Sequence, residues 1–506
     1  MLKTKRKGHK RIAVLFFLAA VLLNSSAAYA GDPYDGYNYN VWGQSVPAPN
    51  SYLPERAIRG EELGIGRFSN PQDMFVDGNG ELYVLDSGNN RIVILDSDLK
   101  VEKVIGRFTA DGDEISLNEP AGICVSGEDL IYLADSGNGR ILAVNREGNV
   151  VKEIGKPVSD IIPTDFSYKP EKVLVDSKNI IYVMAYGVYE GIVAFDGGGS
   201  FLEFYGSNRV EITLALLSDL FWKSIFTREQ KESMGRYVPV EYSNFDIDNK
   251  DFIYTTTVNT SDSRNEIKKL NPMGQNILRH KLTAANGSRL NAYDYGDQES
   301  YRFRASLQDT SFVDITVDGD DIISALDQAR GRIFQYDQES NLLCIFGGLG
   351  DRLGTFSKPC AIENLKDRIL VLDSDKSSIT VFRPTPYGVY VREAVKLYGQ
   401  GRYEAALGSW DEVLKRNSNF ELAYSGIGQA LMKKEAYGEA MDYFKLSYDR
   451  DGYDKAFNEY RKEYVRGHFS LLALGLFCII LLAWSLLNRK RIARYFGSFR
   501  KGGSNG

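Results

Sequence analysis

Few residues of the kinds that build metal or nucleophilic sites are present in this chain of 506 residues. It contains three histidines, and two of them stand apart: His9 lies in a basic N-terminal segment and His468 borders a long apolar run. His280 is left alone, so a metal site made of several histidines is nearly excluded. No two cysteines have the C-x-x-C spacing of zinc or redox motifs.

Paired cysteines and excess basic charge are also lacking, and each lack excludes a class of protein. Three of the four cysteines, Cys124, Cys344 and Cys360, lie outside the apolar run, and their odd number favours small buried side chains over disulfides. The net charge of -6 predicts no nucleic-acid partner. Aromatic residues at 12% and 48 glycines are instead typical of β-structure with many tight turns.

The N-terminus has the layout of a secretory signal peptide. Six Lys or Arg residues lie within residues 3–11, an apolar run follows at 12–23, and Ala28-Tyr29-Ala30 is a cleavage site. As a helix the apolar run would span only about 18 Å, short of a bilayer core of about 30 Å. We therefore predict that residues 1–30 are a signal peptide and that the remainder is exported.

A second apolar run, close to the C-terminus, is long enough for a transmembrane helix, which we place at 469–488. The tail at 489–506 contains basic residues and no acidic ones, which favours the cytoplasm. The predicted topology is a single-pass protein of a bacterial cytoplasmic membrane, with its bulk extracytoplasmic and its C-terminus in the cytoplasm. A buried helix of a soluble protein is the alternative.

Between the two apolar runs, one sequence pattern recurs at a period of about 50 residues. "YVLDSGNNRIVIL" from Tyr83 is followed by "YLADSGNGRILAV" from Tyr132, and weaker copies bring the number to six. Each copy has short alternating apolar segments broken by Gly, Asn and Asp turns, which indicates four strands in meander order. One such sheet cannot bury both faces alone, so radial stacking into a β-propeller is predicted.

The stretches "GRFSNP" and "GTFSKP", together with "YVLDSGNNRI", closely resemble the NHL repeat, whose family forms six-bladed propellers. The resemblance implies a mainly β fold, with a six-bladed NHL-like propeller at 53–386 after a linker at 31–52. Residues 54–64 resemble an outermost strand that has no blade of its own. We expect this strand to complete the sixth copy and close the ring, because closure removes an exposed sheet edge.

Aspartate and arginine recur five residues apart in three of the copies. The aspartate ends the second strand and the arginine begins the third, so a turn can bring them together as an ion pair. Some copies lack the pair, and this unevenness favours a structural role over a catalytic one. The predicted structural turn pairs are Asp86 and Arg91, Asp135 and Arg140, and Asp327 and Arg332.

Two segments show helical rather than strand periodicity. Apolar residues recur at helical spacing in an insertion at 207–237, which we predict to be an amphipathic helix. Residues 388–466 contain two stretches that align at a shift of 34, with Ala406 matching Ala440. This spacing resembles the tetratricopeptide repeat and predicts helical hairpins that form a stalk leading to the transmembrane helix. Peptide binding by the hairpins is the alternative use.

Aligning the six copies on their prolines identifies candidate ligand-binding residues at the mouth of the central channel. The starts of the innermost strands carry Asp73, Gly122, Lys172, Asn244, Asp314 and Ala361, of which Asp73, Lys172, Asn244 and Asp314 are the candidates. They suit a polar ligand, and a solvated channel is the alternative. Carboxylates and amides also suit Ca²⁺ or Mg²⁺, although no catalytic residues can be named.

These features predict a non-catalytic protein. We expect a membrane-anchored extracytoplasmic binding or scaffold protein whose propeller recognises a glycan, a peptide or a protein. The short tail leaves no room for a catalytic domain inside the cell, so any effect must pass through a membrane partner. The alternative is a divalent-metal-dependent lactonase or hydrolase at the propeller channel, because some related propellers resemble lactonases.

Overall fold

The computed structural model describes residues 31–158, 168–206 except 187, 189 and 190, 242–257, 267–278, 295–297 and 310–492. The expected signal peptide at 1–30, the helical insertion at 207–237 and His280 lie outside the described residues. The chain divides into two compact units, residues 1–392 and 393–506.

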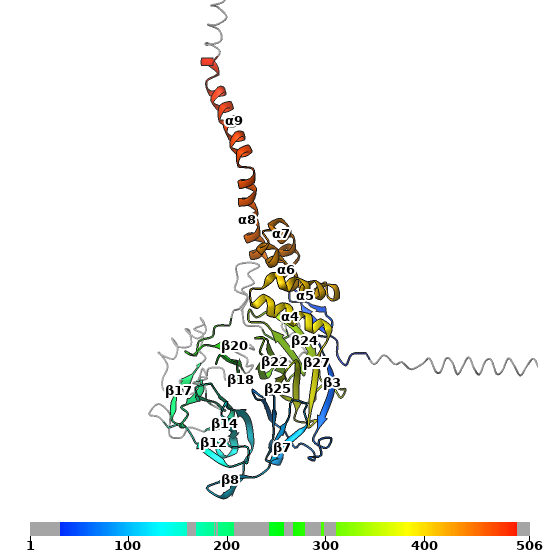
Figure 1. The fold of residues 1–506 in the computed structure, drawn as a ribbon, viewed down its shortest axis with the longest axis vertical. Helices are drawn as coiled ribbons and strands as arrows, with labels where there is room; N and C mark the ends of the chain where they lie inside the picture. The colour runs from blue at the N-terminus through cyan, green and yellow to red at the C-terminus, as the bar shows by residue number, and fades with distance from the viewer. Residues whose placement is uncertain are drawn as a thin grey trace, which may run out of the picture. The chain divides into compact units, whose positions relative to one another are not determined.

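The first unit is a six-bladed β-propeller, and its first three blades are four-stranded antiparallel meanders (Figure 1). Blade one consists of β4 (Asp73–Val76), β5 (Leu82–Asp86), β6 (Arg91–Leu95) and β7 (Val101–Ile105). The short hairpin of β8 (Phe108–Ala110) and β9 (Asp113–Ile115) follows. Blade two consists of β10 (Pro120–Val125), β11 (Ile131–Asp135), β12 (Arg140–Val144) and β13 (Val150–Ile154). Blade three consists of β14 (Lys169–Val175), β15 (Ile181–Tyr186), β16 (Ile192–Phe195) and β17 (Phe201–Tyr205).

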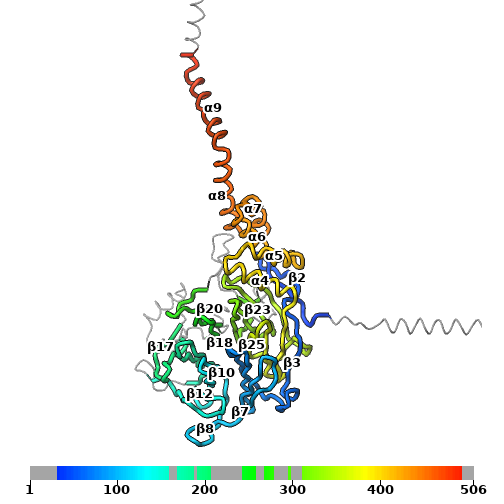
Figure 2. Tube along the Cα trace, viewed as in Figure 1, coloured from blue at the N-terminus to red at the C-terminus, as the bar shows by residue number. Residues whose placement is uncertain are grey.

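The last three blades continue the trace in sequence order (Figure 2). Blade four has, within the described residues, β18 (Tyr242–Ile247), β19 (Ile253–Thr257) and β20 (Ile267–Leu270). Blade five consists of β21 (Phe312–Val317), β22 (Ile323–Asp327), β23 (Arg332–Tyr336) and β24 (Leu342–Gly347). Blade six consists of β25 (Pro359–Leu365), β26 (Arg368–Asp373), β27 (Ser378–Pro384) and, from the start of the chain, β3 (Tyr52–Arg59).

Strand β3 closes the ring in the manner that the sequence predicts. It pairs antiparallel with β27, with Ile58 opposite Ile379 and Tyr52 opposite Pro384. In Figure 1 the blue strand from the start of the chain therefore lies beside the yellow strand that ends the propeller. Because the two ends of the propeller share one sheet, opening the ring requires breaking a full strand pairing.

The segment expected as a linker, residues 31–52, contains two strands. β1 (Tyr37–Tyr39) and β2 (Ser45–Pro47) form a hairpin that extends blade five beyond β24. Its turn is held by the Asn40 side chain, which accepts hydrogen bonds from the backbone N–H groups of Trp42 and Gln44, each at 3.0 Å. Three-residue strands give too short an alternation to be recognised in the sequence.

The hydrophobic core of the propeller lies between neighbouring blades. Leu85 and Ile92 of blade one pack with Ile123 and Leu133 of blade two, and equivalent clusters lie between other neighbours. The second strands of five blades are consequently buried at nearly every position. Such continuous burial explains why these strands are mainly apolar, since the two faces of each blade are covered by its two neighbours.

Helix α4 (Pro386–Gly399) follows blade six. Its first part belongs to the propeller unit, where Arg392 Nη1 lies 2.7 Å from Asp318 Oδ2 and Arg392 Nη2 lies 3.3 Å from Asp320 Oδ2. Arg392 Nη1 also donates to the Tyr52 hydroxyl at 3.1 Å. This arginine therefore fixes the start of α4 to blade five and to the closing strand β3.

The second unit consists of helices packed in sequence order. They are α5 (Tyr403–Arg416), α6 (Glu421–Lys433), α7 (Tyr437–Leu446) and α8 (Arg450–Gly467). Ala406 and Ala440 are fully buried, and Gly428 of α6 lies directly against the ring of Phe444. Small residues thus let the helices approach, as the 34-residue spacing predicts.

Helix α9 (Phe469–Leu487) follows α8, and it is exposed along its length. Within the described residues it is the one helix whose length and composition would allow it to cross a membrane.

Candidate functional site

Most of the innermost strands share a local distortion near the hub, by which we mean the centre of the ring, where the innermost strands of the six blades meet. In five blades the register between the first and second strands shifts at the same place, for example between Pro170 and Lys172 in blade three. A β-bulge of this kind re-aims the side chain that follows it. Lys172, Asn244 and Asp314 each follow such a shift, and together with Asp73, whose strand pairing shows no shift, they line one common cavity.

Two of these residues form an ion pair across blade two. Lys172 Nζ of blade three lies 2.6 Å from Asp73 Oδ1 of blade one, and Asp73 Oδ2 accepts from the backbone N–H of Ile123 at 2.9 Å. Blade two contributes Gly122 at the equivalent position, where a Cβ would lie 2.5 Å from the carbonyl oxygen of Glu171. Glycine is therefore required there, because any side chain would push blades two and three apart.

The other two residues connect blades four, five and six. Asn244 Nδ2 donates to Asp314 Oδ1 and to the carbonyl oxygen of Val313, the latter at 3.0 Å. Asp314 Oδ2 accepts from the backbone N–H of Ile362 at 2.6 Å. Together with the Asp73 bonds, these contacts link blades one, two and three to one another, and blades four, five and six to one another, near the axis.

The expected ligand-binding residues are thus brought together, but they bind one another rather than surround an open site. The cavity between them has a volume of about 20 Å³, which is enough for roughly one water molecule. A sugar or a peptide does not fit there. The geometry therefore favours a structural role for the hub over the expected ligand site at the channel mouth.

The hub contains more carboxyl groups than ammonium groups. Asp246 and Glu363 line the same cavity as Asp73 and Asp314, and Lys172 is the lysine among them. Asp246 follows Asn244 by two residues and Glu363 follows Ala361 by two, so the strand period of two could have identified both from the sequence. Asp246 also bridges blades, because its Oδ2 accepts from the backbone N–H of Val317 at 2.8 Å.

Burial in this cluster shifts the protonation of several groups. It raises the pKa of Asp314 to about 7, which the positive charge of Lys172 partly opposes, and raises that of Asp246 to about 6. Burial, followed by repulsion from Asp246, raises the pKa of Glu363 well above its ordinary value. For Lys172, burial acts to lower the pKa, but Asp73 and Asp314 raise it to about 12. The hub therefore carries its lysine charged and retains protons on some carboxyl groups near neutral pH.

The first two predicted turn pairs have the expected geometry. Arg91 Nε lies 2.7 Å from Asp86 Oδ2, and Arg140 Nε lies 2.8 Å from Asp135 Oδ2. Both aspartates are completely buried. The turn between the partners is a short 3-10 segment that ends in a left-handed residue, Asn90 with φ 50° in the first copy. This conformation explains the Asn and Gly of the repeated "SGNN" and "SGNG".

The third predicted pair is corrected by the structure. Arg332 forms its ion pair with Asp297 and bonds to the Tyr37 hydroxyl, while Asp327 Oδ2 is buried without a hydrogen-bond partner. Asp297 comes from the long segment before blade five and Tyr37 comes from the N-terminal hairpin. These additions, which are specific to blade five, provide the arginine with other partners. Burial raises the pKa of Asp327 to about 6.

The repeated aspartate has a second role, which the spacing of residues in the sequence does not predict. In four blades its carboxylate accepts from a backbone N–H just before the first strand of the same blade. The pairs are Asp86 with Ser69 at 2.7 Å, Asp135 with Asn118 at 2.7 Å, Asp327 with Ser311 at 2.9 Å and Asp373 with Ser357 at 2.6 Å. Because Asp373 has this bond without an arginine, the aspartate serves the blade independently of the ion pair.

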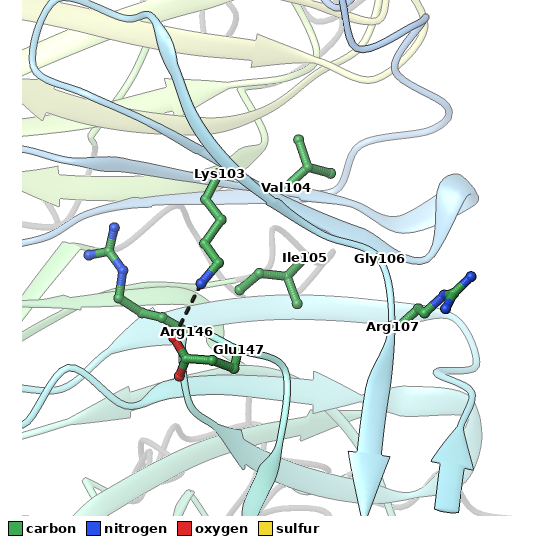
Figure 3. A pocket seen from close by; sticks show the side chains of 7 residues that line it. All are labelled: Lys103, Val104, Ile105, Gly106, Arg107, Arg146 and Glu147. Atoms are coloured by element: carbon green, nitrogen blue, oxygen red, sulfur yellow. Dashed lines mark hydrogen bonds and ion pairs between the residues drawn. The ribbon is translucent and has the colours of Figure 1, made fainter.

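A larger cleft lies at the outer edge of blades one and two (Figure 3). It has a volume of about 410 Å³ and is lined by Lys103, Val104, Ile105, Gly106, Arg107, Arg146 and Glu147. Lys103 Nζ lies 3.3 Å from Glu147 Oε1, and Arg146 pairs with Glu81 at 2.6 Å and with Glu102 at 2.9 Å. These ion pairs offset the charges of Lys103 and Arg146 along the cleft.

Metal binding finds no preformed ligand set in the part of the chain that the structure describes. Within it, no three His, Cys, Asp or Glu side chains form a group that could hold a metal ion. The expected lactonase alternative therefore has no ligand geometry to support it within these residues.

The fold is a six-bladed β-propeller, and part of the chain matches the NHL repeat. Residues 68–95 and 117–150, which cover much of blades one and two, match the NHL repeat. No match was found among curated protein sequences. Among solved structures, the chain is similar to a catalytically inactive virginiamycin B lyase from Staphylococcus aureus with quinupristin, at 11% identity over 69% of this chain and 87% of that chain, with a TM-score of 0.35.

A second similar structure is the PQQ-bound aldose sugar dehydrogenase from Streptomyces coelicolor. Its identity is 12% over 67% of this chain and 99% of that chain, with a TM-score of 0.38. At these identities neither activity is transferred to this chain. What the repeats and the fold support is the coarser conclusion of a propeller suited to binding or scaffolding.

Proposed function

We propose that this chain is a membrane-anchored extracytoplasmic binding or scaffold protein. Its propeller recognises a protein or a carbohydrate through surface residues, and it acts through a partner in the membrane. Helix α9 is the transmembrane anchor, and the basic tail after it lies in the cytoplasm. The hub serves to hold the blades together rather than to bind the ligand.

The observation that carries this proposal is the exposure of α9. All 19 residues are uncharged, and none is buried against the rest of the chain. A soluble protein does not leave so large an apolar surface in water, whereas a bilayer core accommodates a helix of about 20 apolar residues. The signal peptide predicted at the other end then places the propeller outside the cell.

The state of the hub supports binding over catalysis. Enzymatic hydrolysis at the channel would need an accessible electrophile and a positioned base. In the hub, each of the four expected site residues is bonded to another blade, and the space between them holds about one water molecule. Ligand recognition is therefore assigned to the outer surfaces of the propeller.

Alkaline extraction of membranes that contain the full chain tests the anchor. We expect the unsubstituted chain to stay in the membrane, and a variant with Leu476→Arg and Ile480→Arg to be released, since each central arginine costs about 3 kcal/mol of insertion. Val389→Arg is the matched control and should stay, because Val389 of α4 is also an exposed apolar residue, at 47% against 59% for Leu476 and 56% for Ile480. Release of the unsubstituted chain would overturn the anchor.

A panel of lactones, assayed with the full chain in detergent with and without Ca²⁺, tests the absence of catalysis. We expect no turnover in either condition. Turnover that requires Ca²⁺ and disappears in Asp314→Ala would replace the binding proposal by the lactonase alternative.

A further inference from the structure

Helix α8 carries a continuous ridge of aromatic side chains. Tyr453, Phe457, Tyr460 and Tyr464 follow one another at steps of four, three and four residues, which is the spacing of a coiled-coil seam. The rings of Tyr453 and Phe457 stack at 6.5 Å between centroids, as do those of Tyr460 and Tyr464. We call these four residues the aromatic ridge.

The ridge begins at α7 and continues beyond it. Ala456 is fully buried and Tyr453 packs against the cluster around Phe444, so the start of α8 is covered by α7. Farther along, Phe457 is 43% exposed, Tyr460 is 42% exposed and Tyr464 is 51% exposed. Three large aromatic side chains in a row at this exposure are unusual for a surface that faces only water.

The same seam continues into α9 across His468, whose φ of -110° and ψ of 15° separate the two helices. Backbone hydrogen bonds from the His468 N–H to Tyr464 at 3.0 Å and from the Leu472 N–H to His468 at 2.9 Å keep the i to i-4 pattern across this residue. In Figure 1, α8 and α9 form one almost continuous rod, and the heptad positions of the ridge continue as Gly467, Leu471, Leu474, Cys478, Leu481 and Ser485. These positions combine leucine with small residues, whereas the bulky Phe477 and Trp484 lie off the seam. Small residues at the seam allow helices to approach closely in a membrane.

We propose that this seam is the interface for a second copy of the same chain, which pairs through α8 and α9 as a parallel two-stranded coiled coil. The inference rests on the proposed function in one respect: insertion in one membrane makes the two copies parallel. Each ridge residue then meets its own equivalent, as a two-fold interface requires. The seam extends over about five heptads, more than the three to four that indicate a coiled coil.

The charges beside the ridge are compatible with this pairing. In a parallel coiled coil, Glu463 at a g position faces His468 at the e position of the partner, and this juxtaposition does not bring like charges together. Ala456, at the preceding g position, is covered by α7 and does not face the partner. The basic residues Lys455, Lys462 and Arg466 lie on the opposite side of the helix, away from the seam, by the 100° step of an α-helix.

A cysteine cross-linking scan of the full chain in native membranes tests the seam. In a Cys478→Ala background, cysteine is introduced singly at three ridge positions, Phe457, Tyr460 and Tyr464, and at two positions off the ridge, Asn458 and Lys462. The matched control is Lys462→Cys, because this side chain is 65% exposed. Cys124 and Cys344 are buried and should not react, and the half-buried Cys360 is replaced by alanine together with Cys478 in the background.

After mild oxidation we expect the ridge variants to shift from the mass of one chain to the mass of two, and the off-ridge variants to stay at the mass of one. Equal cross-linking on both sides, no cross-linking, or linkage to a chain of another mass would overturn the proposal. Alkaline extraction of the same membranes distinguishes failure of this interface from failure of the membrane anchor. If the chain is released but the ridge variants still cross-link, the anchor is overturned and the interface between two copies stands.

Discussion

Replacing Lys172 by methionine would test the structural role of the hub. The change keeps most of the side-chain volume but removes the ammonium group, so Asp73 loses its 2.6 Å partner while it remains only 5% exposed. Removing one member of a buried ion pair typically costs about 3–5 kcal/mol, because the other charge is left uncompensated. We therefore expect Lys172→Met to lower the free energy of unfolding by about 3 kcal/mol at pH 8.

The loss of stability expected for Lys172→Met should also depend on pH, in a direction that the pKa of Asp73 predicts. Burial raises the pKa of Asp73 in the folded state, so its protonated form is favoured relative to the unfolded chain and stability is lost as pH rises. Loss of Lys172 strengthens this effect. The deficit of Lys172→Met should consequently shrink between pH 8 and pH 5, as Asp73 takes up a proton.

Urea unfolding of the full chain in detergent, followed by the circular dichroism of its β-sheets, would measure both effects. Lys100→Met is the matched control, because Lys100 is 75% exposed and its partner Asp98 is 70% exposed, and it should change stability by less than about 0.5 kcal/mol. If Lys172→Met unfolds like the unsubstituted protein, the ion pair does not hold the blades together, and the hub would again be open to a ligand-binding interpretation.

Three further stability predictions use the same assay. Glu363→Gln should stabilise the protein at pH 8, on the order of 1 kcal/mol, and have little effect at pH 5. The pKa of Glu363 is raised in the folded state, so the contribution of this residue to the free energy of unfolding is lost as pH rises. A lower free energy of unfolding for the variant at pH 8 would contradict this. Asp327→Asn should likewise be neutral or stabilising at pH 8. Asp86→Asn should destabilise the protein by about 2 kcal/mol, because only Asp86 is paired with the arginine five residues later. Equal effects of the two substitutions would refute this distinction between blades one and five. Asp86→Ala should cost more than Arg91→Ala. Asp86 is completely buried and also binds the backbone N–H of Ser69, whereas Arg91 is 16% exposed, so water can replace its bond to the Ile65 carbonyl oxygen. Equal losses would show that the ion pair dominates, and the reverse order would contradict the backbone role of Asp86.

The propeller architecture could be predicted from the sequence because the same strand and turn patterns recur in successive blades. Strand alternation, the "DSGN" turns and the unpaired strand at 54–64 each report a local requirement, and β3 pairs with β27 as expected. The N-terminal hairpin was missed because strands of three residues, such as Tyr37–Tyr39, hardly show alternation. The predicted signal peptide and helical insertion stay predictions.

The sequence predicted where the candidate site residues lie, but not that they bond to one another. Alignment of the copies placed Asp73, Lys172, Asn244 and Asp314 at the hub, and they do line one cavity. Whether such groups bind a ligand or each other depends on distances across the axis, which no spacing within one blade encodes. The same limit applies to Asp327, whose arginine is taken by Asp297 from a distant part of the chain.

The most direct test of the central claim is the location of the propeller relative to the membrane. Cysteine introduced by Lys100→Cys in blade one, and separately by Ser504→Cys in the tail, would be labelled in intact cells with a maleimide that does not cross the membrane. We predict that the propeller cysteine is labelled in intact cells and the tail cysteine only after permeabilisation. Labelling of the tail alone in intact cells would contradict it.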